Sequence, residues 1–325
     1  MKKKANILIT GGAGYLGAYL TEQLLGSEFL ADRLVVYSRD ELKHFNLKIR
    51  IKEDPRVKFM IGDVRDQERL REAMAGIDVV IHTAAMKHVG VCEENPSECV
   101  KTNINGTENV IRAAKSCGVS KLLFISTDKA VEPASVYGDS KHVGERLCLK
   151  ANTHEMQAVV LRLGNLIGSS GSIVDKLRKS QKHNVFKLSD PQATRFFDSL
   201  QNAWYLVGEA LNKDLGGCVM ISRLRALRIK ELVNAIAPAL AITEGGLGQA
   251  EKRHEQLVAR SEVERLLENE QYYLLPPEKL DVDEALERFR SLPANLVSYS
   301  SSDVELMDLE EIQLLFADFE LLKKL

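Results

Sequence analysis

Several features that would assign a protein to a special class are scarce or missing in this sequence. The five cysteines are odd in number and form no C-x-x-C pair, which favours reduced thiols over a disulfide framework. No apolar run is long enough to span a membrane, and the one after the N-terminal lysines passes straight into a glycine turn. The formal net charge of −2 provides no basic field for nucleic acid. We therefore expect a cytoplasmic protein that binds neither nucleic acid nor a membrane, and we assign it no metal site.

What the sequence does contain is an alternation of strand-like and helix-like segments. Strand-like apolar runs occur at residues 6–10, 34–38, 57–62, 78–84, 121–126 and 158–164. Stretches of helical composition or spacing cover 15–27, 67–76, 96–118 and 137–155, with Gly76 and Gly118 as suitable C-terminal caps. This alternation predicts an α/β fold with a Rossmann-like, doubly wound parallel sheet.

The second half of the chain has a different organisation. With 325 residues the chain exceeds the usual size of one core, and beyond residue 165 the alternation weakens into shorter, glycine-punctuated elements. We expect a Rossmann domain at 1–165 and a smaller C-terminal substrate-binding lobe at 166–325, interleaved with the first. The apolar spacing of residues 307–325 predicts a terminal helix that packs on the body, with a partner interface as the alternative.

A glycine turn follows the first predicted strand. Gly11, Gly14 and Gly17 are spaced three apart, with Tyr15 and Leu16 between them, at the opening of a predicted helix. Such glycines let backbone amides approach a pyrophosphate, although a turn with tight strand–helix packing would also explain them. Because a strand precedes the turn and a helix and second strand follow it, we interpret it as a dinucleotide site.

The end of the second predicted strand favours NADP over NAD. Ser38 and Arg39 stand where an NAD-selective site usually offers a carboxylate, and Arg39 suits a 2′-phosphate, while the nearby Asp40 makes the distinction less sharp. Asp63 and Val64 follow the third strand. Asp63 could accept a hydrogen bond from the adenine amino group, cap the next helix, or do both.

The stretch 124–141 combines four titratable groups that suit redox chemistry. Asp128 and Lys129 can share a target only if the preceding strand has just ended, because adjacent strand residues face opposite ways. Tyr137 and Lys141 are four apart, hence on one helix face. An ammonium and a nicotinamide would stabilise a tyrosinate that takes a hydroxyl proton. Alone, Tyr-x-x-x-Lys is a common coincidence, and the Asp-Lys pair could be a surface salt bridge with the tyrosine merely packed.

Together with the glycine turn and the segment that holds Thr83 and Ala84, this pattern resembles the extended short-chain dehydrogenase/reductase superfamily. More narrowly, segments 82–107, 126–141, 162–172 and 190–197 resemble the UDP-N-acetylglucosamine 4,6-dehydratase family, including its soluble C5-inverting members. The similarity runs from Thr10 to about Glu255. Its most specific element is the Asp-Lys pair, which sugar-nucleotide 4-epimerases of the superfamily generally lack.

The resemblance implies a sequence of proton transfers. Tyr137, aided by Lys141, would accept the proton of the carbon-4 hydroxyl during oxidation. Lys129 would then act as the base at carbon 5, if burial and Lys141 lower its pKa, and Asp128 would protonate the departing carbon-6 hydroxyl. Hydride return to carbon 6 and reprotonation of carbon 5 would close a redox-neutral cycle. The implied activity is an NADP-dependent dehydration of a UDP-sugar that serves surface polysaccharide or glycan biosynthesis.

The same resemblance implies the binding residues. Thr83, Ala84 and Lys87 would join the cofactor site, and substrate contacts would come from Lys87, Asn165, Ser169, Arg195 and Glu251. Arg195 would grip the diphosphate, with a structural salt bridge as its competitor. His88 could contact the sugar or serve as a structural histidine. Long helices that begin near residues 96 and 137 imply a homo-oligomer.

The sequence also departs from the family pattern. Gly248 and Ser170 stand where arginines are common, and Asp175 stands where proline is frequent. Arg223, Arg225 or Arg253 could compensate for the missing cations. Arg223, Arg225 and Arg228 could also hold a small anion, or simply form a solvated surface. A sugar-nucleotide 4-epimerase or reductase, and a catalytically silent NADP-binding protein, remain the alternative functions.

Overall fold

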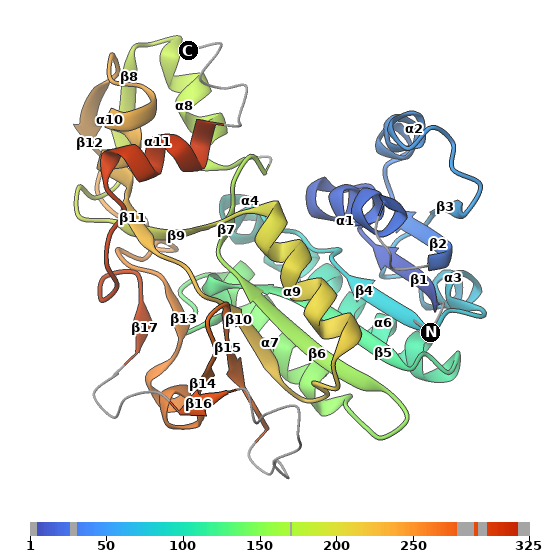
Figure 1. Ribbon diagram of the computed structural model, residues 1–325. Coiled ribbons are helices and arrows are strands. Elements are labelled where there is room, and N and C mark those ends of the chain that lie inside the picture. The colour runs from blue at the N-terminus through green and yellow to red at the C-terminus, as the bar shows by residue number, and fades with distance from the viewer. Residues whose placement is uncertain (1–4, 27–30, 170, 278–288, 292–297, 318–325) are drawn as a thin grey trace.

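A ten-stranded sheet forms the centre of the molecule (Figure 1). The computed structural model describes residues 5–26, 31–169, 171–277, 289–291 and 298–317. The parallel part of the sheet runs, in spatial order, through β3 (Val57–Ile61), β2 (Ala31–Ser38), β1 (Ala5–Thr10), β4 (Val79–His82), β5 (Lys121–Thr127), β6 (Gln157–Leu163) and β10 (Val219–Ser222). An antiparallel edge follows, made of β15 (Tyr272–Leu275), β14 (Leu267–Glu268) and β16 (Arg290–Ser291).

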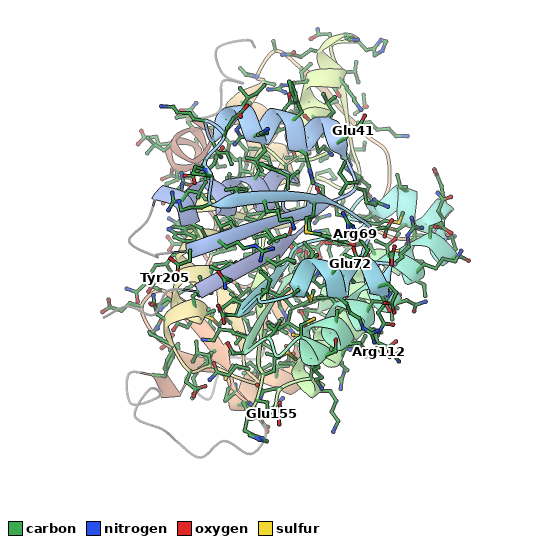
Figure 2. The ribbon with its side chains drawn as sticks, turned by 90° about the vertical axis from the view of Figure 1, so that its right-hand side faces the viewer. Glu41, Arg69, Glu72, Arg112, Glu155 and Tyr205 are labelled. Atoms are coloured by element: carbon green, nitrogen blue, oxygen red, sulfur yellow. The ribbon has the colours of Figure 1, made fainter. Side chains whose placement is uncertain are left out.

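Helices cover both faces of this sheet, which confirms the predicted doubly wound α/β fold. One face packs against α1 (Tyr15–Gly26) and α9 (Leu200–Asn212). The other packs against α3 (Gln67–Met74), α6 (Gly106–Ser116) and α7 (Val136–Lys150). Figure 2 shows α3 and α6 from outside, with the charged side chains Arg69, Glu72 and Arg112 on their outer surface. Their apolar sides reach the sheet because the strands, buried on both faces, are almost wholly apolar.

The predicted helix boundaries hold at some ends and not at others. Gly76 and Gly118 adopt φ of +71° and +73° just beyond α3 and α6, as expected of C-terminal caps. The stretch 96–118 is continuous, but α5 (Pro96–Cys99) leads into a π-helical segment, Val100–Asn105, before α6 begins. Helix α7 ends at Lys150 rather than near 155, because a short turn closed by Thr153 leads directly into β6.

After residue 165 the chain builds a smaller lobe, at the upper left of Figure 1, and then returns to the main sheet. The lobe contains β7 (Asn165–Leu166), β9 (Thr194–Asp198) and β11 (Ala226–Arg228), the pair β8 (Val185–Leu188) and β12 (Ala241–Glu244), and the helices α8 (Ile173–Gln181), α10 (Ile229–Ile236) and α11 (Leu309–Ala317). Its own apolar core lies between these elements. The division at residue 165 stays a prediction, and β10, β14 and β15 show how closely the halves interleave.

The end of the chain packs on this lobe as far as the structure describes it. Helix α11 buries Ile312 and Phe316 in the core that it shares with α10. Residues 318–325 of the predicted terminal helix lie outside the described residues. Within the described ranges, no helix is both long and apolar enough to cross a membrane. Helices α2 (Glu41–Arg50) and α4 (Val89–Glu94) complete the elements that border the site described below.

Candidate active site

The Asp-Lys pair lies where the parallel strand β5 ends. The strand stops at Thr127, and Asp128 opens a single 3-10 turn, Asp128–Ala130. Because the extended backbone ends there, the two neighbouring side chains no longer face opposite ways. Lys129 Nζ lies 3.0 Å from Asp128 Oδ1, and the Thr127 hydroxyl donates to the same oxygen at 2.8 Å. The carboxyl edge of the sheet therefore carries an acid and an amine in contact.

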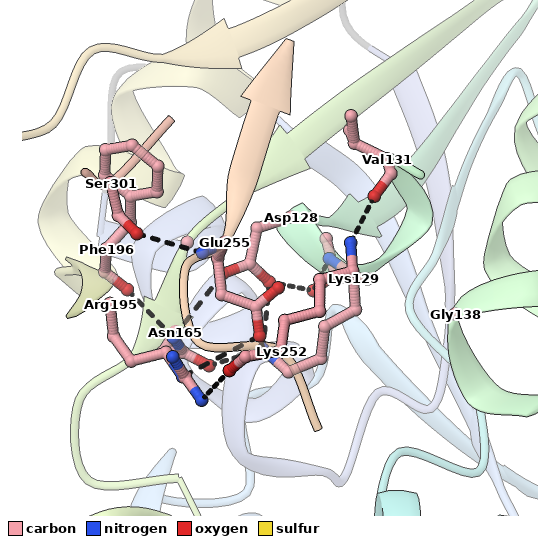
Figure 3. Close-up of polar contacts among 12 residues, drawn as sticks. Asp128, Lys129, Val131, Gly138, Asn165, Arg195, Phe196, Lys252, Glu255 and Ser301 are labelled. Atoms are coloured by element: carbon pink, nitrogen blue, oxygen red, sulfur yellow. Dashed lines mark hydrogen bonds and ion pairs between the residues drawn. The ribbon is translucent and has the colours of Figure 1, made fainter. Parts of the chain in front are cut away.

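Two further side chains, from segments far away in the sequence, complete a polar cluster around Lys129 (Figure 3). Asn165 accepts a hydrogen bond from Lys129 Nζ at 3.0 Å and donates to the carbonyl of Phe196, also at 3.0 Å. Glu255 Oε1 lies 3.4 Å from Lys129 Nζ. Asp128 is 0% exposed and Glu255 4%. Asn165 was predicted from the resemblance, whereas Glu255 was missed, because nothing in the charged run that it ends distinguishes it from a solvated loop residue.

The carboxylates decide the protonation of this cluster. Burial alone lowers the pKa of the Lys129 ammonium, but Asp128 and Glu255 outweigh burial and hold the pKa above its ordinary value. The condition that burial and Lys141 lower the pKa of Lys129 is therefore not met in this structure. Burial raises the pKa of Asp128, against the opposing effect of Lys129. Glu255 shows the reverse balance, since burial raises its pKa but Lys129 and Arg195 bring it below its ordinary value.

Helix α7 carries Tyr137 to the same site. Ser135 caps this helix by accepting a hydrogen bond from the amide of Gly138 at 3.1 Å. Tyr137 is 8% exposed, and burial raises the pKa of its hydroxyl to about 12, with Lys129 acting in the opposite direction. Of the two predicted ammonium groups, Lys129 is thus the one that favours the tyrosinate most strongly in this structure.

Lys141 lies one turn further along α7 and is 5% exposed. Its ammonium donates to the carbonyl of Ile125 at 2.7 Å and lies 3.8 Å from the centre of the Phe124 ring. Burial lowers its pKa to about 8, against the opposing charge of Glu145. Lys141 can therefore exchange its proton near neutral pH, as a group that relays charge beside a nicotinamide would.

The glycine turn has the geometry that a dinucleotide needs. Gly11 has φ of +67°, and a Cβ there would lie 2.8 Å from Thr83 Oγ1 and 2.9 Å from the Ala84 backbone. A Cβ on Gly14 or Gly17 would come within 2.9 Å or 2.4 Å of the Gly11 carbonyl. Helix α1 starts directly after, so the amides of its first turn, including those of Tyr15 and Leu16, have no acceptors within the helix. These residues fit a pyrophosphate.

The residues predicted for the ribose end surround the carboxyl end of β2. Ser38 Oγ lies 2.5 Å from His44 Nε2, on α2. Asp40 is the N-cap of α2 and accepts from the amide of Lys43 at 3.0 Å, so its carboxylate already has a structural role. The Arg39 side chain is 57% exposed, with its nearest carboxylate, Asp63, at 3.5 Å. Its guanidinium thus remains accessible beside the site.

Asp63 does not cap the next helix. The N-cap of α3 is Asp66, which accepts from the amide of Arg69 at 3.0 Å. Asp63 instead accepts from the amide of Arg65 at 2.9 Å and pairs with the Arg65 side chain. The capping interpretation of Asp63 is therefore wrong, while its contact with adenine stays a prediction. Val64 is buried beside it.

The predicted substrate residues are distributed over several segments. Arg195 reaches the cluster, with Nε 3.7 Å from Glu255 Oε1, but its terminal nitrogens donate to the carbonyls of Lys252 and Arg253 at 2.8 Å. The salt-bridge alternative thus describes Arg195 in this structure. Lys87 follows β4, Ser169 lies in the turn before α8, and Glu251 accepts from the amide of Gly248 at 3.3 Å. Ser170 lies outside the described residues.

The arginines considered as replacements for the missing cations or as ligands of a small anion are all paired with carboxylates. Arg253 binds Asp190 at 2.7 Å, and Arg228 binds Glu231 at 3.2 Å. Arg225 contacts Glu305 and Glu311, and Arg223 lies 3.7 Å from Glu268. A paired guanidinium is a weaker anion ligand than a free one, so these contacts argue against compensation. His88 stands at the N-cap position of α4 without a side-chain capping hydrogen bond, and its ring lies against Gly171, where a Cβ would be 2.4 Å from it.

A doubly wound sheet with a glycine turn after β1, and Tyr137 and Lys141 on the helix after β5, define an extended short-chain dehydrogenase/reductase. Within this class the chain matches the family described as "Polysaccharide biosynthesis protein" over residues 7–277. The chain therefore belongs to that family. The inverting UDP-N-acetylglucosamine 4,6-dehydratase of Campylobacter jejuni subsp. jejuni serotype O:2 is 39% identical over 289 residues, 87% of this chain and 86% of that protein, which confirms the predicted resemblance. The UDP-glucose 4-epimerase of Rickettsia bellii (strain RML369-C) is 33% identical over 97% of this chain and 96% of its own length.

Solved structures show the same architecture. Pen from Bacillus thuringiensis is 30% identical and superposes with a TM-score of 0.88 over 99% of both chains. DesIV, a dTDP-glucose 4,6-dehydratase from Streptomyces venezuelae solved with NAD and TYD bound, is 21% identical and has a TM-score of 0.68 over 76% of this chain and 86% of its own. The second likeness supports the fold alone.

Proposed function

We propose that this protein is an NADP-dependent sugar-nucleotide 4,6-dehydratase that converts UDP-N-acetylglucosamine to a UDP-4-keto-6-deoxy-N-acetylhexosamine for surface polysaccharide or glycan biosynthesis. The observation that carries the proposal is the buried contact between Asp128 and Lys129 at the end of β5. Oxidation or reduction at carbon 4 needs only Tyr137 and Lys141. A second acid and base beside them supply what the removal of water requires. The C. jejuni relative, named as inverting, extends the proposal to inversion at carbon 5.

Each side chain then has a defined proton to move. Tyr137 takes the proton of the carbon-4 hydroxyl, and the ketone formed there acidifies the hydrogen on carbon 5. Lys129 removes that hydrogen as a proton, and Asp128 donates a proton to the carbon-6 hydroxyl, which departs as water. When bound, the nicotinamide accepts the hydride from carbon 4 and donates it to carbon 6. A proton then returns to carbon 5, and the proton that Tyr137 took from the carbon-4 hydroxyl makes up for the one that Asp128 gave to the departing water. The cycle therefore consumes no reductant, and its net change is the loss of one water.

The contact between the two residues explains how a lysine with a raised pKa can act as a base. Lys129 Nζ and Asp128 Oδ1 are 3.0 Å apart, within hydrogen-bonding distance. One proton transfer along that contact turns the ion pair into a neutral amine and a neutral carboxylic acid. These are the forms that remove the carbon-5 proton and protonate the leaving hydroxyl. No exchange of protons with solvent is needed.

NADP is the proposed cofactor, held by the glycine turn, with Ser38 and Arg39 at the 2′-phosphate. The accessible guanidinium of Arg39 supports this choice, and the structural role of Asp40 removes the nearest carboxylate that would favour NAD. NAD is the alternative, and it is the nicotinamide cofactor bound in the crystal structure of DesIV, which shares the fold. A titration of the cofactor-free protein with NADP and NAD distinguishes the two.

The competing function is sugar-nucleotide 4-epimerisation, which the Rickettsia relative supports. Epimerisation uses Tyr137 without elimination and gives Asp128 and Lys129 no task. Incubation with UDP-N-acetylglucosamine and mass spectrometry separate the functions: a loss of about 18 Da, one water, indicates dehydration. An unchanged mass with a new sugar epimer would overturn the proposal, and an unchanged substrate with bound cofactor would indicate a silent binding protein.

The proposed enzyme works as a cytoplasmic homo-oligomer, with residues 166–325 as its substrate-binding lobe. Val91 on α4, Val100 after α5 and Val143 on α7 are exposed apolar residues on helices that contact one another. A second copy would cover them and bury apolar area. Sedimentation at micromolar concentration tests this part, and a monomer would contradict it.

A further inference from the structure

Glu255 is a buried carboxylate to which the proposed chemistry gives no proton to carry. Its backbone is fixed, because its amide donates to Ser301 Oγ at 2.9 Å and its carbonyl accepts from the Ser301 amide at 2.8 Å. Its side chain points into the cluster of Figure 3, where Oε1 lies 3.4 Å from Lys129 Nζ. Oε2 is buried and has no hydrogen-bond partner among the described residues. An unpartnered buried oxygen is costly, which points to a functional reason for the group.

The geometry places one ammonium between two carboxylates. Both Asp128 and Glu255 contact Lys129, so the two carboxylates lie within about 6 Å of each other. A second negative charge at this distance favours the charged form of the lysine and the neutral form of the other carboxylate. It also holds the lysine head group through a second contact. The Asp-Lys pair therefore shares its ammonium with a third residue.

We propose that Glu255 is a positioning residue that holds Lys129 beside Asp128 and sets the pH range in which the pair carries a single proton. This inference rests on the proposed function, because the single shared proton is what makes the pair both base and acid. Glu255 neither gives nor takes a proton in the reaction. It acts through its charge and through its contact with the Lys129 ammonium.

The pKa shifts of Asp128 and Glu255 agree with these separate roles, in which Asp128 carries a proton and Glu255 does not. Burial raises the pKa of Asp128, and the charge of Glu255 adds to that rise. Burial also raises the pKa of Glu255, but Lys129, Arg195 and Lys252 outweigh it and lower the pKa below its ordinary value. Glu255 is thus the carboxylate that stays ionised while Asp128 takes up the proton.

The test is a titration of Asp128 in the protein with Glu255→Gln. The variant keeps the shape of the side chain and removes its charge, so the midpoint for Asp128 should fall by about one to two pH units. The measurement is ¹³C NMR of protein labelled at the aspartate carboxyl carbon, with the Asp128 signal identified by its loss in Asp128→Asn. Glu264→Gln, at an exposed glutamate of the neighbouring turn, is the charge-matched control and should leave the midpoint unchanged. An unchanged midpoint in Glu255→Gln would overturn the inference.

A second readout separates positioning from a merely structural role. Both limits of the pH profile of dehydration should move to lower pH in Glu255→Gln, since Asp128 and Lys129 both lose a raising influence. Glu255→Asp, which keeps the charge, should restore the parental profile at a reduced rate. A lower rate with an unmoved profile would indicate structure alone and contradict the inference. The NMR titration needs no substrate, so a protein that fails to dehydrate UDP-N-acetylglucosamine would refute the proposed function while the titration still decides the role of Glu255.

Discussion

Substitution of Arg162 by methionine should be among the most destabilising single changes in this protein. Arg162 lies on β6 with its side chain 2% exposed, and it binds two carboxylates, Glu145 on α7 at 2.7 Å and Glu262 at 2.9 Å. It also donates to the carbonyl of Leu257, in β13 (Gln256–Val258), at 2.8 Å. Methionine fills similar space without the charge, so both carboxylates lose their counter-ion. Removal of one member of a buried pair costs about 3–5 kcal/mol, which is the expected fall in the free energy of unfolding.

The pH dependence of this loss follows from the same contacts. Burial raises the pKa of Glu262, but Arg162 outweighs it and keeps the pKa below its ordinary value. This lowered pKa gives the parent stability that is present above the unfolded-state pKa and is lost as pH falls through the folded-state value. Without Arg162, burial raises the pKa of Glu262, and this carboxylate takes up a proton on folding. The difference in free energy of unfolding between the parent protein and Arg162→Met should therefore become smaller as the pH falls.

Urea unfolding of Arg162→Met across pH measures both effects. The matched control is Arg112→Met, because Arg112 lies on the outer face of α6 with its side chain 59% exposed (Figure 2). There it pairs with Glu108. An exposed pair contributes about 0–1 kcal/mol, so the control should unfold almost as the parent does. A loss below about 1 kcal/mol in Arg162→Met as well would refute the reasoning about the buried network.

Three further predictions concern the cofactor and the site. Arg39→Ala should weaken NADP binding by about 1–3 kcal/mol and leave NAD binding nearly unchanged, and equal losses in a titration would refute the 2′-phosphate assignment. Gly11→Ala should prevent cofactor binding, measured by the same titration, because φ of +67° and the nearby Thr83 exclude a Cβ. Lys141→Met should abolish turnover yet raise the thermal midpoint of unfolding at neutral pH. Burial lowers the pKa of Lys141 to about 8, so its buried charge destabilises the folded state at every pH below the pKa that Lys141 has in the unfolded chain. A lower midpoint in calorimetry would contradict this.

The sequence predicted those parts of the site that depend on local spacing. The end of β5 before Asp128, the shared helix face of Tyr137 and Lys141, and the turn at Gly11 follow from strand and helix geometry alone. Asp63 shows the limit of this approach. Two aspartates three residues apart both precede α3, and only the backbone path determines that Asp66 is the cap.

The parts that could not be predicted depend on packing between distant segments. Glu255 reaches Lys129 only because β13 packs beside the 3-10 turn, and no local pattern distinguishes it from the charged residues before it. The sequence also provided no measure of how strongly Asp128 and Glu255 together oppose the effect of burial on the pKa of Lys129. The arginines of the second half were open to several interpretations for the same reason. Apart from Glu231, three residues after Arg228, their carboxylate partners lie far away in the sequence, as Asp190 does for Arg253.

The central claim is that Tyr137 and Lys129 act on different bonds, and one single-turnover experiment tests it most directly. Protein loaded with NADP is mixed with UDP-N-acetylglucosamine in heavy water, and reduced nicotinamide is followed by absorbance while deuterium at carbon 5 is measured by mass spectrometry. Lys129→Ala should accumulate reduced cofactor without exchange at carbon 5 or dehydrated product, and Tyr137→Phe should form no reduced cofactor at all. Exchange at carbon 5 at the parental rate in Lys129→Ala would show that Lys129 is not the base and would contradict the account.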